Sequence, residues 1–232
     1  MPNATKESKI AKIISAAEVL IDEKGVFDFS FKELSKLSGV SNGTLYREFQ
    51  SKDELLCTIF TNKLKKHIQI MDYLHQAELT GKEKIISHVY YTYFSIKNDE
   101  ASVADRFLIT NYALYKNARP EFTDEMKKQI EILTNKFLYQ YTSLKESKII
   151  NASLTKAKRQ MIYMQIVTRG LNVIAGNRYT PKRKIKLDML IPLLTPILDD
   201  LEWTPGPSSE YDINKILVTV NTLSDNGYIN VS

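Results

Sequence analysis

The side chains best suited to reading DNA bases lie in one short stretch of the chain. Asn42 has the amide geometry that pairs bidentately with adenine, while Arg47 and Lys32 carry donors that suit the O6 and N7 acceptors of guanine. Each of the three can instead bind a phosphate or point into solvent, and the residue types alone leave these alternatives open. The stretch therefore predicts a nucleic-acid surface with three candidates for base recognition.

Neighbouring residues have the chemistry that binds a DNA backbone. Lys52 follows a capping serine at the start of a long predicted helix, where its ammonium and unpaired backbone N–H groups can converge on one phosphate. Thr44 and Tyr46 offer hydroxyls, and Tyr46 is large enough to contact a thymine methyl group. Ser41 is primarily a helix cap that can also donate to phosphate, and Gly43 allows the start of a helix to approach DNA closely.

Groups that perform catalysis or hold metals show no matching arrangement in this sequence. His67, His75 and His88 have no spacing to cysteine or carboxylates that is typical of a metal site, and no nucleophile-elbow, zinc-protease or phosphate-loop motif occurs. Cys57 is the only cysteine and falls on an amphipathic segment, which favours a small buried side chain. We therefore expect a protein that is not an enzyme and that has no cofactor or metal.

Local signals define the first two elements that position the candidate residues. Apolar residues recur at helical spacing from Ile10 to Ile21, and Gly25 stands where a C-terminal cap is expected. The sequence Ser30–Glu33 is a capping box that starts a second, short helix. Leu34 and Leu37 are predicted to point inward from that helix.

A third short helix and a long fourth one follow. Gly39 suits the tight turn between helices, and Ser41 caps a helix whose packed face contains Leu45 and Phe49. A second capping box at Ser51–Glu54 opens a long amphipathic helix. Two short helices joined by such a turn form a helix-turn-helix, whose second helix fits the major groove of B-DNA.

The rest of the chain predicts an all-α protein, in which the long helix joins a three-helix N-terminal domain to a larger helical bundle. Further helical segments are predicted near 82–97, 100–117, 121–145, 154–176 and 184–202. The segment from Ile185 to Leu201 is apolar nearly all round, so we expect it either to be central in the bundle or to pack against a second subunit. A turn-rich linker from Trp203 precedes a predicted terminal helix.

Charge and hydropathy set the expected compartment and partners. The formal net charge of +5 and the pI of about 9.0 agree with a polyanionic partner. Lys6, Lys9 and Lys12 add nonspecific attraction to DNA or form a solvated helix face, and the sequence leaves both interpretations open. The N-terminus is polar and no apolar run has the length of a membrane span, so we expect a cytoplasmic protein with no membrane contact.

The segment from Phe31 to Leu55 resembles the signature of the TetR family of helix-turn-helix transcriptional regulators. The resemblance extends over about residues 8–68 and rests on Gly39-Val40-Ser41, on Gly43-Thr44-Leu45-Tyr46, and on Phe49 followed by Ser51-Lys52-Asp53-Glu54-Leu55. Ser35 departs from the pattern, where alanine is common, and so does Glu48, where histidine or tyrosine is common. Because a carboxylate repels phosphate, we expect Glu48 to turn aside or to pair with a neighbouring lysine or arginine.

The resemblance implies a homodimeric repressor that is released from its DNA operator by a small-molecule ligand, and the two-fold symmetry of such a dimer predicts a palindromic operator. It implies a DNA-binding domain at 8–68, a ligand-binding and dimerisation domain at 69–202, and a C-terminal extension at 203–232. The dimer would form mainly through the helices near 154–176 and 184–202. An alternative is a DNA-bound regulator controlled by a protein partner that docks on the C-terminal domain or extension.

Candidate ligand-binding residues come from charges and aromatic rings in the C-terminal domain. Arg106 and Arg169 fall inside apolar helical stretches, where an unpaired charge is costly, so each is expected to meet a carboxylate or an anionic ligand. Tyr112 and Tyr163 are the aromatic candidates for ligand binding in this domain. The sequence favours a salt bridge within or between subunits for the two arginines and leaves the ligand role as the alternative.

Overall fold

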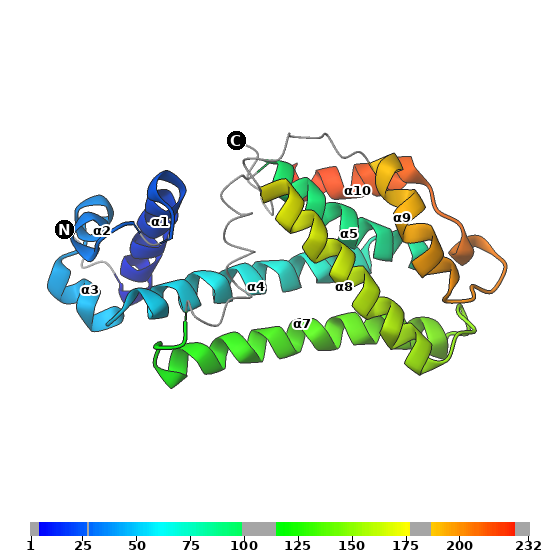
Figure 1. Cartoon of the computed structure of the whole chain (residues 1–232), viewed down its shortest axis with the longest axis horizontal. Helices are drawn as coiled ribbons and strands as arrows, with labels where there is room; N and C mark the ends of the chain where they lie inside the picture. Colours follow the sequence, from blue (N-terminus) through cyan, green and yellow to red (C-terminus); the bar gives the residue numbers. More distant parts are fainter. Residues whose placement is uncertain (1–4, 27, 99–114, 177–186, 226–232) are drawn as a thin grey trace. The chain divides into compact units, whose positions relative to one another are not determined.

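A computed structural model describes residues 5–26, 28–98, 115–176 and 187–225 of the chain, and over these residues it confirms the predicted all-α class. The helices are α1 (Lys6–Lys24), α2 (Phe31–Ser38), α3 (Asn42–Glu48), α4 (Lys52–Gln76), α5 (Gly81–Asn98), α7 (Pro120–Glu146), α8 (Leu154–Gly176), α9 (Leu187–Asp199), the short 3₁₀ helix η2 (Pro207–Ser209) and α10 (Ile213–Asp225) (Figure 1). An isolated antiparallel β-bridge joins Ile150 and Trp203. Of the predicted segment 100–117, only residues 115–117 are described, and they form a turn.

The described residues form two compact units. The first contains residues 5–63 and 115–128, and the second contains residues 64–98 and everything described from Gln129 onward. Both α4 and α7 have residues in each unit. Residues 115–128 thus belong with the N-terminal helices although they lie far outside the domain expected at 8–68.

The core of the first unit is built from the apolar faces of its short helices. Fully buried side chains come from Ile13 and Ala17 of α1, Leu34 of α2 and Leu45 of α3. Leu37 was expected to join them, and that prediction is wrong because its side chain is 51% exposed. Phe31 and Leu34 occupy the covered side of this helix. Each step of three residues turns the position by about 60°, so Leu37, two such steps from Phe31, lies about 120° away from it.

Side-chain caps define where the second and third helices begin. Ser30 accepts the backbone N–H of Glu33, and the Glu33 carboxylate accepts the backbone N–H of Ser30 at 2.8 Å, so the predicted capping box is present. Hydrogen bonds from Lys24 and Ser30 lower the pKa of Glu33 to about 2. Gly39 has φ +66°, the left-handed conformation that the turn requires.

The second predicted capping box, at Ser51–Glu54, is only half formed. The N–H of Glu54 donates to Ser51 Oγ at 3.4 Å, but the Glu54 carboxylate accepts the N–H of Gln50 at 2.7 Å instead of that of Ser51. Arg119, just before α7, donates to both carboxylate oxygens, from Nε at 2.7 Å and from Nη2 at 3.1 Å. Glu54 therefore joins the start of α4 to a segment that is remote in sequence.

Glu54→Ala should destabilise the first unit by roughly 1–3 kcal/mol, because a buried, doubly paired carboxylate is lost together with the acceptor of the Gln50 N–H. Burial raises the pKa of Glu54, but hydrogen bonds from Arg119 and Gln50 outweigh burial and hold the pKa below its ordinary value of 4.5. The carboxylate therefore stabilises the fold above about pH 4.5, and this contribution disappears as the pH falls further. Chemical unfolding between pH 7 and pH 3 measures both effects.

Glu121→Ala is the matched control for Glu54→Ala. Glu121 also pairs with Arg119, at 2.9 Å, but its side chain is exposed, so its removal should have little effect on unfolding. If both substitutions lowered the free energy of unfolding equally, the burial of Glu54 would not contribute to its effect on stability.

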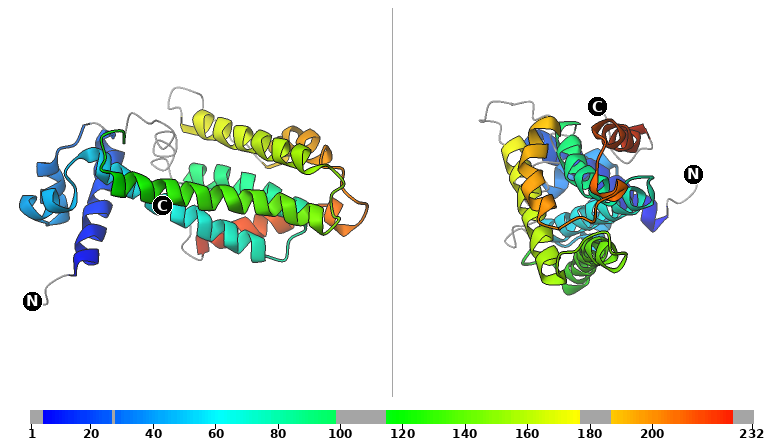
Figure 2. Two further views of the ribbon diagram at one scale, coloured as in Figure 1. Left: turned by 90° about the horizontal axis from the view of Figure 1, so that it is seen from below. Right: turned by 90° about the vertical axis from the view of Figure 1, so that its right-hand side faces the viewer.

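The second unit is arranged around α5. Helices α8 and α9 lie on one side of α5 and α10 lies on the other (Figure 2). Leu187, Leu190, Leu194 and Leu198 of α9 are buried in this core. The nearly all-apolar segment thus has one face inside the unit, as expected of a central helix.

Residues 203–225 pack within the second unit. The predicted terminal helix is present as α10, and its Ile216, Val220 and Leu223 are fully buried. Trp203 donates its indole N–H to the Leu198 carbonyl at 2.7 Å, and Lys82 of α5 lies over the Trp203 ring. These three side chains of α10 therefore face the core of this unit, whereas Val218 on the same helix is exposed.

Candidate nucleic-acid interface

Helix α3 has one covered side and one open side. Leu45 and Phe49 are buried, while Asn42, Tyr46 and Arg47 are exposed. Four of the predicted DNA-binding residues, Ser41, Asn42, Tyr46 and Arg47, therefore line the open side. Gly43 is exposed as well, and no atom lies within 4 Å of where a β-carbon would stand, so the first turn of α3 is open to a close approach.

Contacts from neighbouring residues fix the first turn of α3 and its tyrosine. Ser41 Oγ accepts the N–H of Thr44 at 3.3 Å and lies 3.1 Å from Thr44 Oγ1, so both hydroxyls are used in capping. The ring of Tyr46 packs against that of Phe31, with 5.1 Å between the ring centroids. This contact positions Tyr46 from α2 while leaving the tyrosine more than half exposed.

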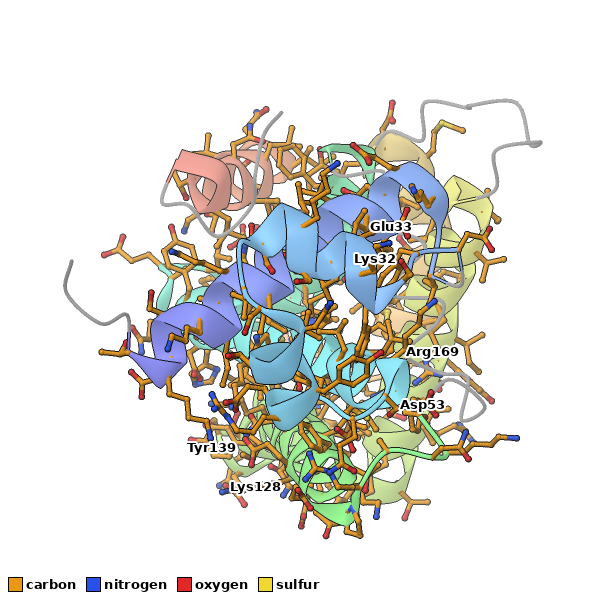
Figure 3. All side chains as sticks on the ribbon, turned by 90° about the vertical axis from the view of Figure 1, so that its left-hand side faces the viewer. Lys32, Glu33, Asp53, Lys128, Tyr139 and Arg169 are labelled. Carbon is orange, nitrogen blue, oxygen red and sulfur yellow. The ribbon has the colours of Figure 1, made fainter. Side chains whose placement is uncertain are left out.

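Helix α2 contributes Lys32 and supports the turn before α3. Lys32 is exposed and lies beside Glu33 on α2 (Figure 3). Ser35, which stands where the TetR signature commonly has alanine, donates its hydroxyl to the Val40 carbonyl at 2.7 Å. The departure at Ser35 therefore adds a hydrogen bond across the turn that precedes the recognition helix.

Lys52 is the first residue of α4, as predicted, and its side chain has a contact that the sequence analysis did not find. The ammonium lies 4.5 Å from the centre of the Phe29 ring. Such a cation–π contact holds the ammonium near the helix start. The aromatic residues between α1 and α2 were the available signal, but nothing local in the sequence pairs them with Lys52.

Glu48 pairs with cations, in agreement with the expectation for this position. One carboxylate oxygen accepts Arg47 Nε at 3.3 Å, and the other lies 3.4 Å from Lys6 Nζ on α1. Lys6, Lys9, Arg47 and Glu48 together line a hollow on the surface of the first unit. The open side of α3 therefore continues into a cluster of three cations and one acid.

The four predicted ligand-binding residues are not brought together by the described structure. Arg106 and Tyr112 lie outside the described residues. Tyr163 and Arg169 are exposed on α8, where Figure 3 marks Arg169. The apolar neighbours Ile166 and Val173, on which the argument for a partner of Arg169 rested, are themselves exposed.

A pair of histidines in the second unit was missed by the sequence analysis. The Nε2 atoms of His67 and His88 lie 2.8 Å apart, and the ring of Phe137 packs edge-on against His88. Because the two residues are on different helices, their spacing in the sequence gives no signal. Among the described residues, no group of three potential metal ligands occurs.

Cys57 is buried, as predicted. Burial raises the pKa of its thiol to about 11, so the reactive thiolate is scarce at neutral pH. This environment agrees with the interpretation of Cys57 as a small core residue.

Comparison with known proteins finds sequence matches to bacterial regulators in the N-terminal part of the chain. Residues 13–57 match the family model described as bacterial regulatory proteins, tetR family. The fatty acid metabolism regulator protein of Bacillus subtilis is 32% identical over 80 residues, which are 34% of this chain and 41% of that protein. The chain thus spans about two fifths of the length of the curated relatives that it matches.

Solved structures match over more of the chain. Salmonella enterica GusR has a TM-score of 0.64 at 18% identity, covering 85% of this chain and 97% of GusR. The transcriptional regulator FadR from Bacillus subtilis, in complex with stearoyl-CoA, has a TM-score of 0.53 at 20% identity, covering 82% of this chain and 96% of FadR. At these identities the likeness shows a shared fold.

None of the helices in the described ranges has the length and the apolar character that a membrane span requires.

The segment that matches the family model contains α2 and α3, and with them the open side of α3. Residues 13–57 therefore form a helix-turn-helix that matches the TetR family of bacterial regulatory proteins, within a helical fold that the described residues share with a solved transcriptional regulator.

Proposed function

We propose that this chain is a sequence-specific transcriptional regulator that binds a palindromic operator as a homodimer and leaves it when a small molecule binds. The observation that carries this proposal is the open side of α3, where Asn42, Tyr46 and Arg47 are exposed on a helix capped by Ser41. A capped helix with amide, phenol and guanidinium groups on its open side has the donors and acceptors that read base edges in the major groove.

The proposed dimer is supported by an open apolar surface on α8 and α9, which we call the α8–α9 face. It consists of exposed apolar side chains from both helices: Ile162, Tyr163, Ile166, Val173, Ile174, Met189 and Leu193. Ile162, Ile166 and Val173 recur at the spacing of one helix face. Among the described residues, no atom of another element lies within 4 Å of where a β-carbon of Gly170 would stand. Apolar surface of this kind is costly in water and is stabilised by burial against a second copy.

A two-fold dimer has a direct consequence for the DNA site. One recognition helix reads too few base pairs for useful specificity, whereas two helices related by symmetry read two half-sites. The half-sites should lie about 34–36 Å apart or at a multiple of that distance, and the site should be palindromic.

The proposed ligand site lies within residues 82–176 of the second unit. The interior there is rich in aromatic rings, and Ser87 has a buried hydroxyl with no hydrogen-bond partner among the described residues. The complex of FadR with stearoyl-CoA supports a small molecule as the signal, because it shows one regulator of this fold with a ligand bound. Arg106 and Tyr112 remain predicted contacts, whereas the exposure of Tyr163 and Arg169 favours a place for them in the dimer interface.

Selection from random DNA duplexes tests the proposed function. The purified chain should enrich one palindromic sequence, which then serves as the operator in all further measurements. Enrichment of an asymmetric single half-site, or of no sequence at all, would contradict the proposal.

Ligand release has a quantitative test. If a ligand weakens operator binding, operator DNA must weaken ligand binding by the same factor, about 5- to 150-fold for a coupling of about 1–3 kcal/mol. Calorimetric titration of candidate metabolites, acyl-CoA thioesters included, with and without operator DNA measures that factor. Equal ligand affinity in both titrations would contradict release by this ligand and would leave the proposal of DNA recognition unaffected.

A further inference from the structure

Glu48 places a negative charge among the cations beside the recognition helix. It is the last residue of α3, and its neighbours in the hollow are Lys6, Lys9 and Arg47. A carboxylate at this place repels phosphate and weakens nonspecific attraction to DNA.

The carboxylate is covered, whereas the cations that it holds are not. The side chain of Glu48 is 10% exposed, compared with 67% for Arg47 and 75% for Lys6. DNA that approaches the open side of α3 thus meets the guanidinium and the ammonium before it meets the acid. Glu48 is therefore placed to act on DNA through its neighbours.

The way in which Glu48 holds Arg47 decides which edge of the guanidinium remains available. Glu48 accepts the Nε hydrogen of Arg47, which is the inner donor of the fork. The two terminal nitrogens are then presented end-on, with the spacing that pairs with guanine O6 and N7. An arginine that is held in this way loses less rotamer freedom on binding than one that is free in solution.

We propose that Glu48 is a positioning residue for DNA recognition: it bridges α1 and α3 and aims the terminal nitrogens of Arg47 at a guanine in the major groove. The carboxylate in this bridge lowers the affinity for phosphates of any sequence, and the positioning of Arg47 raises the preference for the operator over random DNA. This inference rests on the proposed function, because it requires that α3 reads bases.

Glu48→Ala tests the proposal through a ratio of affinities. The preference for the selected operator over random duplex should fall about 2- to 10-fold per half-site, the factor that corresponds to ordering one long side chain. Affinity for random duplex should rise, because a repulsive charge is gone. Glu48→Gln replaces the carboxylate with an amide whose oxygen can still accept the Arg47 hydrogen, so it should lose less preference than Glu48→Ala.

Glu7→Ala is the matched control, because Glu7 is an exposed acid in the first turn of α1, beside Lys6. It removes the same charge from the same region and should raise affinity for random duplex and for operator alike. A merely electrostatic role for Glu48 predicts that Glu48→Ala behaves like this control, and that result would overturn the proposal.

A double-mutant cycle with Arg47→Ala separates positioning from a structural role. In the Arg47→Ala background there is no guanidinium to aim, so Glu48→Ala should leave the operator preference unchanged. The same loss of preference in both backgrounds would show that Glu48 acts on the fold. Thermal unfolding identifies variants that do not fold. If Glu48→Ala does not fold, Glu48→Gln is used to measure the ratio of operator affinity to random-duplex affinity.

Failure of the inference and failure of the proposed function give different results. If the unsubstituted chain enriches no DNA sequence, the proposed function fails before Glu48 is tested. If it enriches an operator and Glu48→Ala keeps the full preference for that operator, only the inference fails.

Discussion

Replacing Ile166 with aspartate should convert dimers of this chain into monomers and abolish tight operator binding. Ile166 is 60% exposed in the middle of the α8–α9 face. Two-fold symmetry places two such aspartates in one interface, and each buried unpaired charge costs several kcal/mol. Because about 1.4 kcal/mol corresponds to a factor of ten, the dissociation constant of the dimer should rise roughly a thousandfold or more. Sedimentation over a range of protein concentrations measures this change.

Val218→Asp provides the matched control for Ile166→Asp. Val218 is 63% exposed, but it lies on α10, on the other side of α5 from α8 and α9. This substitution should leave both the dimer and operator binding intact. Persistence of dimers in the Ile166→Asp variant, or monomers in both variants, would contradict the assignment of the α8–α9 face.

Arg47→Ala should reduce operator affinity by about 1–3 kcal/mol per half-site and relax the base preference at one position, because a bidentate contact to guanine is lost. The effect on random duplex should be much smaller. Since a dimer has two half-sites, the two losses combine on the palindromic operator. Titration of the operator, of single-base variants and of random duplex measures all three quantities.

Lys52→Ala should behave differently from Arg47→Ala, because a phosphate contact carries no sequence information. It should weaken binding to operator and random duplex by the same factor and make the salt dependence shallower by roughly one counterion per subunit. Thermal unfolding is a necessary check, since the substitution also removes the contact of Lys52 with the Phe29 ring. If Arg47→Ala lowers both affinities equally, base reading would pass to Asn42 and Lys32.

Local signals were sufficient for the framework of the recognition site. The Ser30–Glu33 capping box, the left-handed Gly39 and the cap at Ser41 involve residues at most a few positions apart, so their geometry follows from the backbone of one helix end. The buried and open sides of α3 follow from helical periodicity in the same way. The family resemblance rested on these same short spacings, and the match over residues 13–57 confirms it.

Periodicity alone did not decide which side of an apolar helix is covered. Leu37 and Arg169 have apolar neighbours at helical spacing, yet both are exposed, because no helix among the described residues covers the sides on which they lie. For α9, the sequence left open a central place or a subunit contact. The structure buries Leu190 and Leu194, as expected of a central helix, and leaves Met189 and Leu193 exposed, so only the exposed side is open to the proposed subunit contact.

Only the tertiary structure decided which charged and aromatic side chains meet. Glu54 and Arg119 are 65 positions apart, Lys6 and Glu48 lie on different helices, and Lys52 meets the ring of Phe29. Each pair forms because packing of the apolar faces brings two helices or their connections together at a particular register. The sequence by itself determined the capped recognition helix and its candidate residues, whereas packing between remote segments determined how Glu48, Lys52 and Glu54 are held.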